Sequence, residues 1–292
     1  QESLAQAIFK DLCAELRYWT TSGEGNVVTK NEVLKCIAQE NEHPISSPIV
    51  VPIPNPIFPS RADLSKQFAQ EIYKSENAVF FISGVAGSGK TRLISSLHNA
   101  FGEAANVFRF HVFKPLDVDD FSYSPDRGIV DAKSMWATFI NHLRKRVDNP
   151  YEDTAIPVIN ELCNEDQLRF ETIRLAELLF KQSHVYTILI IDGIDHAARA
   201  ENELTFLSHL PAPETIPLGI KFVLVGQPKE GYPAYPAWLQ SPEARVEEMS
   251  IPDLGIQDVK HLLKCKSDIP GNEINAVAAK IMELTGGNTL SV

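Results

Sequence analysis

The chain of 292 residues has no run of about 18 consecutive apolar residues, so its sequence predicts no membrane-spanning helix. It shows no cleavable secretory signal and no internal repeat. Cysteine is scarce, and its four positions follow neither a metal-ligand nor a redox spacing: Cys13, Cys36, Cys163 and Cys265. These absences argue against a disulfide framework or a cysteine-ligated metal, and they favour a reducing, cytoplasmic location.

Basic residues are also scarce: the chain has 27 Lys and Arg residues against 38 Asp and Glu residues, which gives a net charge of −11. Proteins that coat nucleic acid present a basic face to its phosphates. We therefore expect neither nucleic acid nor a membrane among the partners, although a local basic patch is compatible with this composition. Hydrophobic residues at 44% and charged residues at 22% are typical of an ordinary globular protein.

One stretch carries the strongest chemical signal: an apolar strand, 79–82, followed by a glycine-rich loop and a helical pattern. The loop matches Gly-x-x-x-x-Gly-Lys-Ser/Thr, the phosphate-binding loop (P-loop) of nucleoside triphosphatases. Its residues are Gly84, Val85, Ala86, Gly87, Ser88, Gly89, Lys90 and Thr91. The glycines let consecutive backbone N–H groups point at a triphosphate, and the helix that begins at Lys90 directs its positive dipole end there.

The P-loop side chains have distinct predicted roles. Lys90 is expected to reach the β- and γ-phosphates, and the Thr91 hydroxyl to ligate Mg²⁺. Arg92 is counted with the nucleotide-contacting residues because it directly follows the loop.

A second carboxylate-bearing element is predicted about a hundred residues later. The apolar run 186–191 is typical of a buried parallel strand, and Asp192 at its end is expected to hold Mg²⁺ through water. Asp195 is placed to orient or deprotonate the attacking water, or alternatively to cap a helix. His196 is expected to be a bystander, and His111 fits a core or rim histidine better than a ligand.

Strands alternate with helices, which predicts a three-layer α/β P-loop NTPase with a mainly parallel central sheet. Predicted strands are 79–82, 107–113, 186–191, 220–225 and an edge strand at 245–251; predicted helices are 63–73, 134–147, 165–182, 203–210, 256–266 and 272–284. The predicted domains are a short helical appendage (1–43), a proline-rich linker (44–59), the NTPase core (60–251) and the start of a small helical lid (252–292). The lid is expected to be cut short, and the chain to be a fragment of something longer.

Four segments resemble the signal-transduction ATPases with numerous domains (STAND), which include the NACHT and NB-ARC families of innate-immunity and anti-phage sensors. They are 58–64, 192–195, 223–228 and 285–290. The match is imperfect: Gln227 stands where that family has an arginine that senses the γ-phosphate, and Thr289 replaces a proline that contacts adenine. Ser60 and Asp63 replace a glycine and a glutamate, and His196 stands where an acid is frequent.

The resemblance implies ATP or ADP with Mg²⁺, with adenine near Arg61 and Thr289. It further implies slow hydrolysis, self-assembly in the ATP-bound state, and a protein partner or trigger ligand that acts through flanking domains. Two alternatives stay open: an AAA-type ATPase acting on DNA, and a regulatory scaffold that binds nucleotide without hydrolysing it. A GTPase is disfavoured because no Asn-Lys-x-Asp motif occurs.

Overall fold

The structure is a computed structural model that describes residues 59–112, 132–150, 164–199, 205–266 and 269–287. All of these residues belong to one compact unit. The predicted N-terminal appendage, nearly all of the proline-rich linker and Thr289 lie outside the described residues, so the domain boundaries stay predictions. In the described part of the chain, no helix combines the length and apolar character that a membrane crossing requires.

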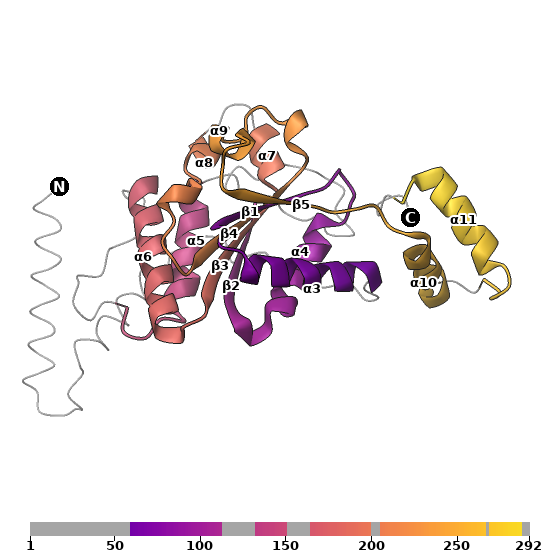
Figure 1. The fold of residues 1–292 in the computed structure, drawn as a ribbon, viewed down its shortest axis with the longest axis horizontal. Helices are drawn as coiled ribbons and strands as arrows, with labels where there is room; N and C mark the ends of the chain where they lie inside the picture. Colours follow the sequence, from indigo (N-terminus) through magenta and orange to yellow (C-terminus); the bar gives the residue numbers. More distant parts are fainter. Residues whose placement is uncertain (1–58, 113–131, 151–163, 200–204, 267–268, 288–292) are drawn as a thin grey trace, which may run out of the picture. The chain divides into compact units, whose positions relative to one another are not determined.

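Five strands form one parallel sheet in the order β2-β3-β4-β1-β5 (Figure 1). They are β1 (Val79–Ser83), β2 (Ala105–His111), β3 (Tyr186–Asp192), β4 (Ile220–Gly226) and β5 (Val246–Ser250). The strands β1 and β4 are buried along their whole length, as continuous apolar runs in a parallel sheet should be. The edge strand β5 is only partly buried.

Helices cover both faces of the sheet (Figure 1). On one face, α3 (Pro59–Lys74) and α4 (Lys90–Phe101) enclose an apolar core with side chains of all five strands. On the other face lie α5 (Ala132–Arg144) and α6 (Glu165–Ser183), which pack against each other. The predicted three-layer α/β fold is confirmed.

Shorter elements complete the unit. They are η1 (Gly102–Ala104), α7 (Ile194–Arg199), α8 (Thr205–Ser208), η2 (Pro213–Thr215), η3 (Lys229–Gly231) and α9 (Ala237–Gln240). After β5 come two helices that contact each other, α10 (Ile256–Lys266) and α11 (Ile274–Thr285). Gly286 ends α11 in a left-handed conformation, which glycine adopts without strain.

Most predicted boundaries lie within two residues of the observed ones, but the first helix begins at Pro59, four residues earlier than expected. The second strand begins at Ala105 and ends at His111, two residues earlier than expected at each end. The helix α5 is likewise displaced towards the N-terminus. The predicted helix 203–210 forms only as Thr205–Ser208 within the described residues, and Pro211 and Pro213 prevent its continuation.

Gly219, just before β4, offers a test of the packing between the sheet and α6. Its φ is +92°, and an added Cβ would lie 2.3 Å from the Phe180 ring. We expect Gly219→Ala to lower the free energy of unfolding by about 2–3 kcal/mol through backbone strain and overpacking, measured by urea denaturation. Gly102→Ala is the matched control, because its φ is +53° and no atom lies within 4 Å. Equal losses in the two variants would contradict this packing.

Lys221 on β4 is a buried cation at the C-terminal end of α3. Its Nζ donates to the carbonyl oxygens of Ile72 and Ser75, each at 2.6 Å, and lies 4.4 Å from the centre of the Tyr186 ring. The lysine therefore caps carbonyls that the end of the helix leaves without helical partners. Burial lowers the pKa of Lys221 to about 8, although the charge of Glu247 opposes the shift.

This shift predicts a pH dependence of stability. The ordinary pKa of lysine is 10.5, so between pH values of about 8 and about 10 the unfolded chain binds more protons than the folded one. The free energy of unfolding of the parent should therefore rise with pH in this window, relative to the nearly isosteric Lys221→Met variant. Urea titrations of both proteins at about pH 7 and about pH 9.5 measure the difference, and a relative fall would refute the shift.

Candidate nucleotide-binding site

The P-loop joins β1 to α4 and adopts a conformation that depends on glycine. Gly87 and Gly89 have φ values of 79° and 85°, a region that residues with a Cβ rarely adopt. Gly89 is the N-cap of α4, and no side chain caps this helix. The amino end of α4 therefore presents backbone N–H groups to an anion.

Lys90 lies folded back on the P-loop. Its Nζ donates to the carbonyl oxygens of Gly84 at 2.8 Å and Val85 at 3.0 Å. Burial lowers the pKa of Lys90, and the charges of Asp195 and Asp192 oppose this shift. The ammonium group is thus held at the loop and close to both predicted acids, where a triphosphate could replace the carbonyl oxygens as its partner.

The other predicted loop residues differ in exposure. Ser88 is buried, Thr91 is half-buried in the first turn of α4, and Arg92 is exposed. Gly84 donates its N–H to the carbonyl of Gly226 at 3.2 Å, which ties the start of the loop to the end of β4.

Asp192 ends β3 and is 1% exposed. Its Oδ2 lies 3.1 Å from Nδ1 of His111, the last residue of β2, because the β2–β3 register places these two residues side by side. The sequence reading of His111 as a core or rim histidine missed this contact. Both residues end apolar strands, but the adjacency of β2 and β3 cannot be read from the chain alone.

Asp195 lies in the first turn of α7 and is 2% exposed. Its Oδ2 accepts hydrogen bonds from Gln227 Nε2 and Arg199 Nη2, each at 3.1 Å. Its Oδ1 is buried and has no hydrogen-bond partner among the described residues. The structure thus brings together Asp195 and Gln227, two predicted site residues, and it fixes one of the two carboxylate oxygens through hydrogen bonds.

A tyrosine pair that the sequence analysis missed supports this arrangement. The rings of Tyr232 and Tyr235 stack with centroids 5.2 Å apart. Arg199 Nε donates to the Tyr232 hydroxyl at 3.0 Å, and the Tyr235 hydroxyl donates to the Gln227 carbonyl at 3.2 Å. Burial and the nearby Asp195 charge raise the pKa of Tyr235, so its hydroxyl stays protonated and remains a donor. The only signal in the sequence was two tyrosines three residues apart after Gln227.

Arg61, the predicted adenine contact, lies on α3 and is 4% exposed. Its Nη2 donates to the Ser88 carbonyl at 3.2 Å and to the Pro252 carbonyl at 2.6 Å. Burial lowers the pKa of Arg61, opposed by the charges of Asp258 and Asp253. Arg61 therefore connects the P-loop to the segment between β5 and α10.

The donor set suits Mg²⁺ bound together with a nucleotide. No group of three or more His, Cys, Asp or Glu side chains that could hold a metal occurs in the ranges the structure describes. Mg²⁺ usually keeps several waters and takes one or two protein oxygens besides the phosphates. The Thr91 hydroxyl and the Asp192 carboxylate are oxygen ligands of the kind that this requirement calls for.

A family model described as "AAA domain" matches residues 47–231, more than half of the chain. No curated protein matches the sequence. Solved structures that match include the Walker-type ATPase of Pyrococcus abyssi, at 14% identity and a TM-score of 0.47 over 80% of this chain and 65% of that one. A second match is the Aeropyrum pernix ORC1 protein in complex with DNA, at 13% identity and a TM-score of 0.49 over 85% of this chain and 60% of that one. A third is a STAND protein with a tetratricopeptide repeat sensor from Pyrococcus horikoshii, at 16% identity and a TM-score of 0.41 over 85% of this chain and 30% of that one.

The chain thus spans less than two thirds of the length of each of these three proteins. At such identities the structural matches concern the fold alone. They therefore do not test the expectation that nucleic acid is not a partner.

Proposed function

Because this chain belongs to the AAA domain family, whose members are P-loop ATPases, we propose that it is the ATP-binding and slowly hydrolysing switch module of a signal-transduction ATPase. The carrying observation is the convergence of the P-loop, Asp192, Asp195 and Gln227 at one edge of the sheet. These residues lie at or just after the carboxyl ends of β1, β3 and β4, where ligands of open parallel sheets bind.

In the proposed mechanism, the N–H groups of the P-loop and the Lys90 ammonium bind the phosphates. Thr91 and Asp192 would hold Mg²⁺, which supplies charge neutralisation at the phosphate oxygens. Asp195 orients water through Oδ1 and accepts its proton, while Arg199 and Gln227 keep the carboxylate in place through Oδ2. Gln227 can also donate to the γ-phosphate, but it carries no charge, which fits slow turnover.

The switch itself would act through Arg61. This residue bonds the P-loop at Ser88 and the lid connection at Pro252, so a nucleotide-dependent change in the loop reaches the helices α10 and α11. The base of these helices is also tied together, because Leu254 donates its N–H to the Gly287 carbonyl at 3.0 Å. ATP binding would select one arrangement of lid against sheet and promote self-assembly.

Hydrogen–deuterium exchange tests the switch directly. We expect the amides of 252–258 to exchange at different rates with ADP and with a non-hydrolysable ATP analogue. In Arg61→Gln this difference should shrink while nucleotide is still bound. Light scattering in the same two states tests ATP-dependent assembly. Identical amide exchange rates and an identical molar mass in the ADP-bound and ATP-analogue-bound proteins would contradict a switch.

Two other functions use the same site. A DNA-acting ATPase would show turnover stimulated by duplex DNA. A regulatory scaffold would bind ATP but release no phosphate in a single-turnover experiment. One assay, with and without DNA, therefore separates all three.

A further inference from the structure

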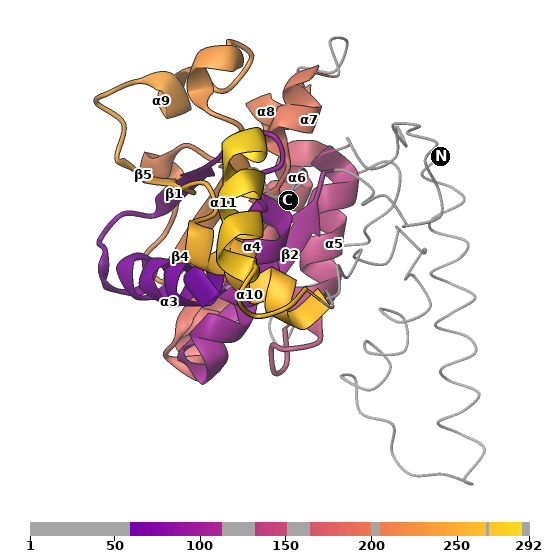
Figure 2. The same ribbon diagram turned by 90° about the vertical axis from the view of Figure 1, so that its right-hand side faces the viewer.

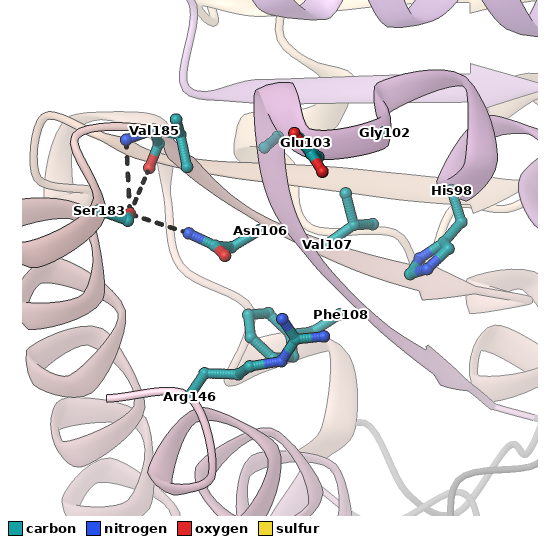
Figure 3. A pocket seen from close by; sticks show the side chains of 10 residues that line it. His98, Gly102, Glu103, Asn106, Val107, Phe108, Arg146, Ser183 and Val185 are labelled. Atoms are coloured by element: carbon teal, nitrogen blue, oxygen red, sulfur yellow. Dashed lines mark hydrogen bonds between the residues drawn. The ribbon is translucent and has the colours of Figure 1, made fainter. Parts of the chain in front are cut away.

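A cavity of about 390 Å³ lies along the first half of β2 (Figure 3). Its wall includes His98 of α4, Glu103, Asn106 and Phe108, with Arg146 and Ser183 from the opposite helical layer. His111 and the nucleotide site lie at the other end of β2. This cavity is therefore distinct from the site described above.

The cavity follows an edge of the sheet. Among the described strands, β2 pairs only with β3, and Figure 2 shows it between α4 and α5. The N–H of Val112 donates to the Asp192 carbonyl on β3 at 2.8 Å. Because backbone direction alternates along a strand, the N–H and C=O groups of Val107 and Arg109 point away from β3. These groups offer main-chain hydrogen bonds to an added strand.

Two arginines and one acid lie around this edge. Burial lowers the pKa of His98, and the nearby Arg109 and Arg146 lower it further. Glu103 is the one acid in the cavity wall. The Nδ1 atom of His98 is buried without a hydrogen-bond partner among the described residues. The His98 ring is therefore neutral near pH 7, and Arg109 and Arg146 outnumber Glu103, which favours an acidic occupant.

We propose that this edge of β2 binds an extended, acidic peptide segment of a partner protein, which adds a strand next to Val107. The main chain of the peptide pairs with the outward N–H and C=O groups of β2. Its carboxylates face Arg146 and its small apolar side chains contact Phe108. The proposal does not depend on nucleotide chemistry, because it uses neither the P-loop nor the two acids.

Blocked hexapeptides of defined sequence test the proposal on the full chain. The probes are acetyl-(Val-Glu)₃-amide, its Val-Lys counterpart, and a Val-Glu peptide with alternate backbone nitrogens methylated. We expect the acidic peptide to bind saturably and to slow hydrogen exchange at residues 107 and 109, while the basic and methylated peptides bind at least about tenfold more weakly. Absence of saturable binding, or equal binding of all three, overturns the proposal.

Two variants locate the site. Val107→Pro removes an outward N–H from an edge strand and leaves the β2–β3 hydrogen bonds in place, and Arg146→Glu reverses the local charge. Each variant should lower the affinity for the acidic peptide by about tenfold or more. Arg169→Glu, near the other end of α6, should leave this affinity unchanged. ATP affinity measured in every variant reports folding independently, and parent-like peptide affinity in both test variants refutes this location.

Discussion

Replacing Lys90 with alanine is expected to weaken ATP binding by about 10²–10³-fold. The Nζ of Lys90 is held by two P-loop carbonyls and lies near two acids, so it is placed to neutralise an arriving triphosphate. Without it, the loop offers N–H dipoles but no positive charge from this side chain. Titration calorimetry with ATP and ADP, each with and without Mg²⁺, measures the loss.

The controls for this experiment separate charge from folding. Lys181→Ala removes an exposed lysine that pairs with Glu177 on α6, and it should bind ATP like the parent. Lys90→Arg keeps the charge with a different shape and should fall between the parent and Lys90→Ala. If Lys90→Ala bound ATP as tightly as the parent, the assignment of this loop as the nucleotide site would fail.

Asp195→Asn should bind ATP with an affinity close to that of the parent but hydrolyse it about 10²–10⁴-fold more slowly. The asparagine carbonyl can still accept hydrogen bonds from Arg199 and Gln227, so the surrounding contacts are kept. What is lost is the basic oxygen equivalent to Oδ1, which has no partner among the described residues. Single-turnover phosphate release measures the change.

The matched control is Asp166→Asn, at an exposed acid on α6 that pairs with Arg169. Its turnover should equal that of the parent. Undiminished turnover in Asp195→Asn would remove this residue from the catalytic role and leave it as a partner of Arg199. A parent that binds ATP but shows no single-turnover hydrolysis would instead favour the scaffold.

The features predicted correctly were local in the sequence. Contiguous residue patterns predict three of these features: the apolar strand before the P-loop, the buried run that ends at Asp192, and the helix 256–266. Boundaries were less accurate where polar and apolar residues mix, as at β2, because burial on an edge strand is incomplete.

The contacts that the sequence could not reveal join distant segments. His111 contacts Asp192 because β2 and β3 are neighbours in the sheet. The residues of a single strand do not determine which strand lies next to it. Gln227 reaches Asp195 across 32 positions. The tyrosines that hold this region lie in an irregular segment without hydrophobic periodicity, so no pattern pointed to them.

The hydrogen bonds made by Ser60 and Arg61 also determine where the chain can be truncated without loss of contacts. Ser60 donates its N–H to Asp258 at 3.0 Å, and Arg61 donates to the Pro252 carbonyl. A truncation after residue 251 would sever both contacts and strip a buried guanidinium of its shortest hydrogen bond. A minimal fragment for biochemistry should accordingly retain the first turn of α10, although the sequence predicts that the NTPase core ends at residue 251.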